Sequence, residues 1–350
     1  MIQKISALSS ASTVVNLSDL LMALTSSIIC KVAFGKRYED EDVESSRFHS
    51  LFNELQSMFV AFFFSDYFPF IGGWIDKLSG LSSRVERVFK DMDEFYNQVI
   101  NDHLDPNKPK SEHEDIVDVL LRLQKERSFS FDHLRPHQSN INGSFNIIAV
   151  GTETSALTVV WAMTELMKNP TIMRKVQDEL PTLIQCTTFI NENDLPKFTY
   201  LKAIVKETFR FHPAVPLLIA REVSQKCSLE GYDIPSHSLV FVNAWAIGRD
   251  PKFWENPEVF MPESFIESSV DFKGQNFEFI PFGAGKRICP GMLVGASTVE
   301  LTLANLLYSF NWELIDGVQK EDIDNDVIPG LTMHKKNPPC LIAKMYPHAT

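Results

Sequence analysis

The sequence lacks the features of a disulfide-stapled or nucleic-acid-binding protein. Its five cysteines are widely spaced and form no CxxC pair, which argues against both a disulfide framework and a zinc ribbon. We interpret them as reduced thiols facing the cytosol. Lys and Arg number 33 against 45 Asp and Glu, so the net charge of -12 provides no basic field for nucleic acid. We therefore expect no nucleic-acid partner.

Long uninterrupted apolar runs are also missing. No stretch reaches the roughly 18 uncharged apolar residues that a membrane-spanning helix requires. The first residues lack the basic-then-apolar pattern of a signal peptide. The densest apolar run, Met58 to Phe64, reads MFVAFFF and is too short to span a membrane. It is either a buried helix end or an interfacial patch that lies on a membrane or lines a substrate entrance.

Hydrophobic periodicity predicts a mainly α fold with a small β region, an α+β fold class. Residues 17–28 and 81–100 place their apolar side chains on one helical face. Residues 149–167 are apolar almost all round, which indicates a central helix buried between others. Asn169 and Pro170 are expected to end that helix.

Strand character appears only in the last third of the chain. Residues 227–243 alternate around Glu230-Gly231, which is typical of a hairpin, and residues 338–346 read as one more strand. The sequence contains no internal repeat and no low-complexity linker. We therefore expect one domain over residues 1–350.

The strongest signal is the run FIPFGAGKRICPG at residues 279–291. Gly283 and Gly285 let the backbone take turns that side chains forbid, and they let a flat ligand approach the main chain. Cys289 stands at the start of a long apolar helix, whose N-terminal amides are expected to depress the thiol pKa and favour a thiolate. Arg287 offers a charge-assisted partner for an anionic group.

Two further motifs are weaker when taken alone. The run KETFR places Glu207 and Arg210 three apart on a helix, where they can pair, although most such pairs are solvated surface contacts. The run GTETS at residues 151–155 lies in the central helix. Its Thr and Ser side chains either bond to their own backbone carbonyls or serve chemistry.

The segment before the central helix contains two residues that disfavour helices. Pro136 and Gly143 both lie in the run LRPHQSNINGSF. Either the helix begins late or residues 135–145 are a divergent insertion.

Together these motifs resemble those of cytochromes P-450. The pattern F-G-x-G-x-R-x-C-x-G resembles the haem-binding signature of that family, and it is formed here by Phe282, Gly283, Gly285, Arg287, Cys289 and Gly291. Other runs, among them VVWAMTELMKNP and VNAWAIGRDPKFWENPEVF, resemble plant members of families 71 and 83. The resemblance implies a cytochrome P-450 fold that is incomplete at the N-terminus, because no membrane anchor or first helices precede Met1. It also implies haem b (iron protoporphyrin IX), held by all six signature residues, with Cys289 as the axial ligand of the iron.

The resemblance assigns roles to the weaker motifs as well. Glu153 would relay protons and Thr154 would hydrogen-bond dioxygen. Glu207 and Arg210 would be structural, joined in the family by an arginine where this chain has Ser264, which implies a weaker lock behind the haem.

Substrate contacts are expected from four segments, residues 59–64, 146–154, 215–219 and 330–332, for which the alternative is plain core packing. The named candidates are Val150, Gly151, Val215, Leu217, Leu218 and Leu331. Val150 stands where the family usually has Ala or Gly, so its β-branched side chain is expected to narrow the oxygen pocket.

The implied function is a monooxygenase of plant secondary metabolism that inserts one atom of O2 into a small lipophilic substrate. Electrons would come from NADPH through NADPH–cytochrome P-450 reductase. The resemblance implies the cytosolic face of the endoplasmic reticulum membrane, with membrane association in the full-length form. Two alternatives stay open: a haem-dependent isomerase or dehydratase, and a non-catalytic truncated remnant that cannot retain haem.

Overall fold

The computed structural model describes residues 1–11, 13–35, 50–51, 54–55, 57–58, 61–68, 70–106, 114–126, 139–184 and 188–346, with backbone alone at 124 and 139–150. The chain forms two compact units. Unit 1 comprises residues 1–22 and 153–350, and unit 2 comprises residues 23–152. The expectation of one domain over the whole chain stays a prediction.

Unit 1 is built around three apolar helices. These are α8 (Ser139–Lys168), which enters the unit at Glu153, α10 (Thr199–Phe211) and α12 (Met292–Ser309). Met163, Ile204 and Leu303 contribute one fully buried side chain from each helix to a common core. The shorter helices of the unit are α1 (Ile2–Ser10), α9 (Pro170–Leu183), α11 (Ala244–Ile247), η1 (Glu192–Lys197), η2 (Pro262–Phe265), η3 (Gly285–Arg287) and η4 (Lys320–Asp322).

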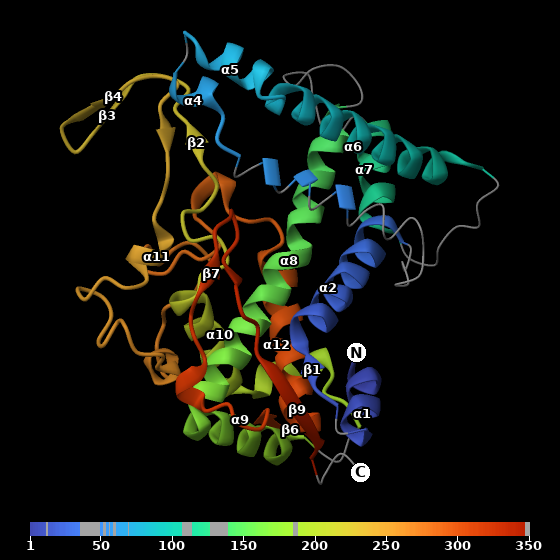
Figure 1. Cartoon of the computed structure of the whole chain (residues 1–350), viewed down its shortest axis with the longest axis vertical. Coiled ribbons are helices and arrows are strands. Elements are labelled where there is room, and N and C mark those ends of the chain that lie inside the picture. The colour runs from blue at the N-terminus through green and yellow to red at the C-terminus, as the bar shows by residue number, and fades with distance from the viewer. Residues whose placement is uncertain are drawn as a thin grey trace. The chain divides into compact units, whose positions relative to one another are not determined.

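The described strands of unit 1 form one three-stranded sheet and three two-stranded ones, all antiparallel. The larger sheet has the order β1-β9-β6, and Figure 1 shows β9 beside β6 with α1 next to them. Its strands are β1 (Val15–Asn16), β6 (Phe310–Leu314) and β9 (Cys340–Met345). The smaller pairs are β2 (Arg221–Glu222) with β5 (Leu239–Val240), β3 (Cys227–Leu229) with β4 (Tyr232–Ile234), and β7 (Val327–Ile328) with β8 (His334–Lys335).

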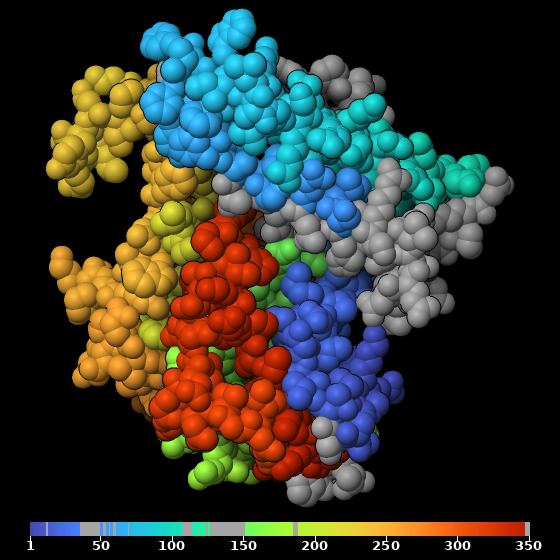
Figure 2. Space-filling view, viewed as in Figure 1, coloured from blue at the N-terminus to red at the C-terminus, as the bar shows by residue number. Residues whose placement is uncertain are grey.

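The predicted hairpin and final strand are confirmed. Strands β3 and β4 pair around Glu230 and Gly231, which take φ values of 50° and 85°. Two successive positive φ values match the right-handed twist of the flanking strands, which is why glycine is favoured in such turns. Figure 2 shows this hairpin, in gold, projecting from the surface of unit 1.

Unit 2 contains the other helices whose bounds the structure describes. They are the later part of α2 (Leu17–Phe34), α4 (Phe64–Tyr67), α5 (Gly72–Leu78), α6 (Leu81–Leu104), α7 (Ile116–Lys125) and the first part of α8. The predicted apolar face of α6 is confirmed, because Val88, Met92, Phe95 and Val99 are buried. Phe95 packs edge-on against Phe34 of α2, with ring centroids 6.1 Å apart.

Helix α2 is a candidate membrane span that the sequence analysis did not expect. Its 18 residues have a mean hydropathy of 1.6, enough by length and composition to cross a membrane, although 39% of this stretch is buried. Core helices pass the same test. Within it Leu17, Leu21, Cys30 and Phe34 pack into hydrophobic clusters, so we interpret α2 as a core helix.

The central helix begins earlier than the predicted residue 149. Helix α8 starts at Ser139, runs through Gly143 and ends at Lys168, and Pro170 then opens α9. A proline suits the first turn of a helix because its missing N–H has no partner there in any case. The question of an insertion at 135–145 falls partly outside the described residues, which exclude 127–138.

Candidate functional site

The cysteine loop of residues 279–291 folds as a tight turn closed by main-chain bonds. The Cys289 amide donates to the Phe282 carbonyl at 3.0 Å, and the one-turn helix η3 lies between them. Gly283 and Gly285 have φ values of 75° and 72°, a region that L side chains rarely adopt. The loop therefore requires both predicted glycines.

The Cys289 side chain is half-buried and is not in a disulfide. Burial raises the pKa of its thiol, and a hydrogen bond from the Gly291 amide opposes that rise without cancelling it. The expectation that the start of α12 lowers this pKa is therefore wrong, because desolvation exceeds the contribution of one amide. A metal ion that bound this sulfur would displace its proton.

The surroundings of Cys289 fit a flat haem group in their donor chemistry and in their space. A Cβ added at Gly285 would meet nothing within 4 Å, and one at Gly283 would meet only Leu218 Cδ1, at 3.8 Å. This flank of the loop is open, and a thiol is the soft donor that iron–thiolate chemistry requires. Arg287 is exposed at the end of η3, where its guanidinium is free of crowding by the core.

Phe282 anchors the loop to the rest of unit 1. Its half-buried ring lies edge-on to Phe209 of α10 at 5.0 Å and tilted against Phe272 at 5.3 Å. Such aromatic pairs contribute packing energy beyond their buried area. The loop is thus held to α10 by its first signature residue and to α12 by Gly291, the residue before that helix.

The acid–threonine segment lies on α8 close to the first turns of α12. A Cβ at Gly295 would stand 3.7 Å from Ser155 Oγ, so the two helices approach at small residues. Glu153 is buried, and its Oε2 lies 3.0 Å from Nε2 of His334. Thr154 is half-buried, and its carbonyl accepts the hydroxyl of Thr158 at 2.8 Å. The described side chains do not include Val150.

Met333 follows the expected substrate segment 330–332 and bonds to Ala214, which precedes the segment 215–219. Its amide donates to the Ala214 carbonyl at 2.8 Å, and its carbonyl accepts the indole N–H of Trp161 on α8 at 2.8 Å. Val215, Leu218 and Leu331 are half-buried, whereas Leu217 is exposed. Of the segment at 59–64, residues 59 and 60 lie outside the described residues, and Gly151 contacts Ile29 within unit 2.

These contacts close a ring within unit 1. Leu218 Cδ1 lies 3.8 Å from the place where a Cβ on Gly283 of the cysteine loop would stand. Ala214 bonds to Met333, and Met333 bonds to Trp161 of α8. Helix α8 also approaches α12, where Ser155 lies beside Gly295. Ser155 is two residues after Glu153, and Gly295 is six residues after Cys289. We call this arrangement the contact ring. It joins the segments that the sequence reading selected separately.

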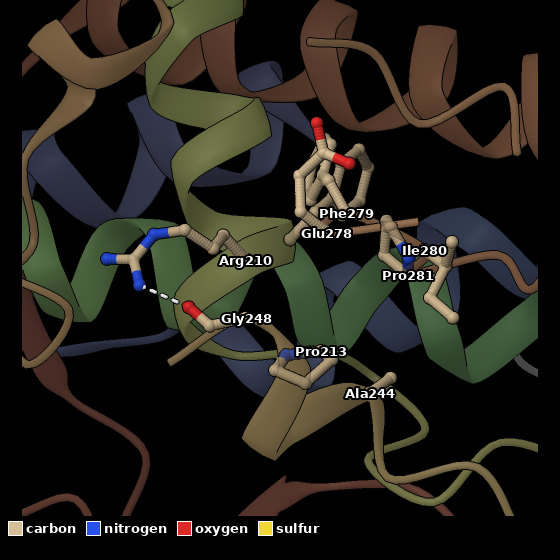
Figure 3. A pocket seen from close by; sticks show the side chains of 9 residues that line it. Arg210, Pro213, Ala244, Gly248, Glu278, Phe279, Ile280 and Pro281 are labelled. Atoms are coloured by element: carbon tan, nitrogen blue, oxygen red, sulfur yellow. Dashed lines mark hydrogen bonds between the residues drawn. The ribbon is translucent and has the colours of Figure 1, made fainter. Parts of the chain in front are cut away.

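The pair of Glu207 and Arg210 is buried, as predicted, and it is fully partnered. Arg210 donates from Nε and Nη2 to the two Glu207 carboxylate oxygens at 2.7 and 2.6 Å. Its remaining donors reach main-chain carbonyls of Gly248, Pro257 and Val259. Figure 3 shows the Arg210–Gly248 bond beside a small pocket lined by Pro213, Ala244, Phe279, Ile280 and others.

The Ser264 substitution does not leave this pair short of a partner. The Met261 amide donates to Glu207 Oε1 at 2.7 Å, from the segment just before η2. Burial raises the pKa of Glu207, opposed by Arg210, by the Met261 amide and by the nearby charge of Arg249. Glu207 thus has a main-chain donor in addition to Arg210, and the weaker lock behind the haem stays a prediction.

Sequence reasoning missed two histidines. His212 follows the last residue of α10 and is buried against Glu165, with Nε2 and Oε1 2.9 Å apart, and its ring stacks on Trp161. His103, Asp115 and Asp118 of unit 2 lie close enough to offer one ligand atom each within 4.8 Å. Both aspartates already accept amides at the start of α7, so we interpret this cluster as a helix cap.

Comparison with known proteins agrees with this geometry. The family model described as "Cytochrome P450" matches residues 1–341. "Cytochrome P450 71A1" of Persea americana is 46% identical over 351 residues, covering 99% of this chain and 69% of the relative. "Strychnine-11-hydroxylase" of Strychnos nux-vomica is 44% identical, covering 95% and 65%. "5-OH-xanthotoxin synthase" of Pastinaca sativa is 44% identical, covering 99% and 68%.

A solved structure described as zebra fish cytochrome P450 with abiraterone shares the fold, with a TM-score of 0.78 at 23% identity, covering 99% of this chain and 76% of that one. The chain spans about two thirds of the length of these curated relatives. The names of several relatives support the expected resemblance to plant family 71. The expected resemblance to family 83 stays a prediction. The chain therefore belongs to the cytochrome P450 family, whose cofactor is haem b and whose members are monooxygenases.

Proposed function

We propose that this chain is a haem-thiolate monooxygenase that inserts one atom of O2 into a small lipophilic molecule. The observation that carries the proposal is the contact ring. It brings the loop of Cys289, the Glu153–Thr154 segment and two apolar segments into one part of unit 1. A thiol donor, a buried acid and an apolar wall are the groups that oxygen insertion requires in one site.

Cys289 would be the axial ligand. A bound haem would supply the activation of oxygen, which a thiolate ligand favours. The Gly291 amide would hold the charged sulfur after its proton has left, because that amide already bonds to Sγ. Arg287, exposed beside the loop, would pair with a propionate through charge-assisted hydrogen bonds.

Glu153 and Thr154 would manage protons at the distal side. Glu153 is buried on α8 and is held by His334, so its carboxyl group can carry a proton where bulk water is scarce. The Thr154 hydroxyl would orient dioxygen by a hydrogen bond. Ser155, the next residue, lies against α12 at Gly295 and so positions this segment along that helix.

The substrate would be a small lipophilic specialised metabolite. Val215, Leu218 and Leu331 offer aliphatic side chains on segments that Met333 ties together. Pockets for such ligands are mostly apolar with a few placed polar groups. Two relatives carry names that refer to strychnine and xanthotoxin, and we extend from these to aromatic lipophilic substrates. The aldoxime substrates suggested by family 83 resemblance are the second group to screen.

The redox partner would be NADPH–cytochrome P-450 reductase, at the cytosolic face of the endoplasmic reticulum. Membrane contact would involve the segment around α4 and α5, which lies at the surface in Figure 2. Phe70, Trp74 and Leu78 are 94, 74 and 87% exposed there. Exposed aromatic and aliphatic side chains gathered on a short segment are typical of an interfacial patch.

The test of the proposed function is spectroscopic. The chain is expressed with a haem supply, reduced, treated with carbon monoxide and compared with Cys289→Ser and with the control Cys340→Ser, which alters an exposed thiol. We expect a red-shifted Soret band in the wild type and the control, and none in Cys289→Ser. Absence of the band in all three would favour a remnant that cannot retain haem.

Turnover distinguishes the remaining alternative. Haem-loaded chain is incubated with reductase, NADPH and a panel of aromatic lipophilic compounds. Product that contains one atom of labelled O2 supports the monooxygenase. Product formed without NADPH would instead support an isomerase or dehydratase.

The membrane contact has its own test. Flotation with phosphatidylcholine vesicles should recover the wild type, and the paired change Phe70→Ser with Trp74→Ser should reduce recovery severalfold. A paired change at Phe253 and Phe277, which are 63 and 71% exposed, serves as the control. Equal loss from both pairs would contradict the assignment to α4 and α5.

A further inference from the structure

Four histidines in the described part of the chain pair with a carboxylate, and one pair differs from the others in its exposure. Side chains are buried on both sides in His103–Asp115 and His212–Glu165. They are exposed on both sides in His237–Glu222. In His334–Glu153 the histidine is 32% exposed and the carboxylate 6%. Only this pair, among the described residues, connects a buried acid with solvent.

The backbone on both sides of His334 is fixed. Met333, the preceding residue, is bonded to Ala214 and to Trp161, and the His334 amide donates to the Thr332 carbonyl at 3.0 Å. Lys335, the following residue, buries its ammonium against the Asp324 carbonyl and carboxylate. A side chain between two fixed neighbours loses little further freedom when it makes a hydrogen bond. The ring of His334 is therefore positioned in advance.

Glu153 is the residue to which we assign proton transfer at the distal side. Its carboxyl group is buried on α8, and a buried acid that gives up a proton must regain one before it can act again. His334 touches that carboxyl group directly and reaches water. Imidazole is the side chain best suited to exchange protons near neutral pH.

We propose that His334 is the positioning residue for Glu153 and the route by which solvent protons reach it, an inference that rests on the proposed function. The Nε2–H of the imidazolium passes its proton to Oε2 of Glu153. The ring is left neutral with its remaining proton on Nδ1, and Nε2 regains a proton from water when the ring turns that nitrogen toward solvent. No electrons move in this step, and one proton enters for each proton that Glu153 delivers inward.

The test compares His334→Leu and His334→Gln with the matched control His237→Gln, which alters an exposed His–Glu pair in the same unit. The measured quantity is coupling, the fraction of NADPH oxidised that appears as product rather than hydrogen peroxide. We expect both His334 variants to lose about tenfold or more, since proton transfer contributes at least that much and water replaces it only partly. KM and the carbon monoxide spectrum should not change. Coupling equal to that of the wild type would overturn the proposal.

A second measurement does not depend on turnover. Tm values of the full chain are measured for Glu153→Ala, His334→Ala and the double variant. We expect the double variant to lose less than the sum of the single losses, because the two side chains share one interaction. Additive losses would overturn the direct pairing. A wild type that lacks the thiolate Soret band would instead overturn the proposed function, and the cycle would still report on the pair.

Discussion

Arg210 and Glu207 form a two-pronged ion pair from which solvent is excluded, with both carboxylate oxygens of Glu207 bound to the same guanidinium at 2.6 and 2.7 Å. The pair lies three residues apart on α10 and reaches out to the main chain at Gly248, Pro257 and Val259. One side-chain pair thus holds α10 to the segment that leads into η2. Its removal has consequences well beyond α10.

We expect Glu207→Gln to lower the free energy of unfolding by about 3 to 5 kcal/mol, because it leaves the buried Arg210 charge unmatched. Glu313→Gln, which alters the exposed pair with Lys344, should cost about 1 kcal/mol or less. Denaturant unfolding of both variants measures the difference. If Glu207→Gln is insoluble, Arg210→Lys is measured instead. It keeps the positive charge but loses the two-pronged guanidinium geometry, so the free energy of unfolding should fall by a smaller amount. Equal costs for Glu207 and Glu313 would contradict the prediction.

Two adjacent lysines in β8 and after it give a second matched pair. The ammonium of Lys335 is buried on Asp324 and holds the pKa of that carboxyl at about 2. Lys336 is exposed near Asp326. Lys335→Met should cost about 2 kcal/mol, typical of a hydrogen bond to a charged group, and Lys336→Met about 0.5 kcal/mol or less. Thermal unfolding at neutral pH measures both, and a larger loss for Lys336→Met would count against the structure here.

The buried His212 predicts a pH dependence of stability. Burial lowers the pKa of its imidazole below the ordinary 6.5, although Glu165 opposes the shift. Between the folded and unfolded pKa values the unfolded chain binds more protons, so stability rises with pH in that window. The contribution is fully present above about pH 6.5 and is lost as the pH falls below it. Tm measured from pH 7 to pH 5 should fall in the wild type and fall less in His212→Gln, and parallel curves would exclude His212 as the cause.

Two glycines have similar backbone angles but differ in the space around them. Substituting each by alanine therefore distinguishes the cost of backbone strain from the cost of a steric clash. Gly285 and Gly274 have φ values of 72° and 78°, but a Cβ at Gly285 would meet nothing within 4 Å, whereas one at Gly274 would lie 2.8 Å from Ile288 Cδ1. Gly285→Ala should cost about 1 to 2 kcal/mol from the left-handed backbone alone, and Gly274→Ala should cost more. Denaturant midpoints test the order. A reversed order would mean that Ile288 moves freely.

The sequence predicted the elements that rest on strong local patterns. The apolar face of α6, the hairpin at Glu230-Gly231 and the strand at Cys340–Met345 follow from periodicity and turn chemistry. The start of α8 was placed too late, because the apolar stretch begins ten residues after the helix does. The low helix propensity of Gly143 disfavoured a helix at that point, but helix propensity is a small energetic effect that tertiary packing overrides.

The site was predicted in its parts but not in its connections. Cys289 and its glycines follow from a dense local motif, and the structure agrees with the turns they make. His334 lies far from Glu153 in sequence, and no local signal couples them. The same holds for the Met261 amide on Glu207, since a main-chain donor has no residue type to recognise. The fall in thiol pKa was wrongly predicted because burial of Cys289 could not be read from its neighbours.

The pairing of β1 with β9 dictates the order in which the protein can mature on the ribosome. Val15 lies opposite Leu341, which comes far later in the chain, and unit 1 takes its pieces from the sequence on both sides of unit 2. Contacts between such distant segments are slow to form, and the apolar surface that they bury stays exposed in the meantime. Unit 2 is contiguous and can collapse while synthesis continues. Val15, Leu17 and Leu21 then lack their β9 neighbour until that strand has been synthesised, which makes this segment a natural client for chaperones.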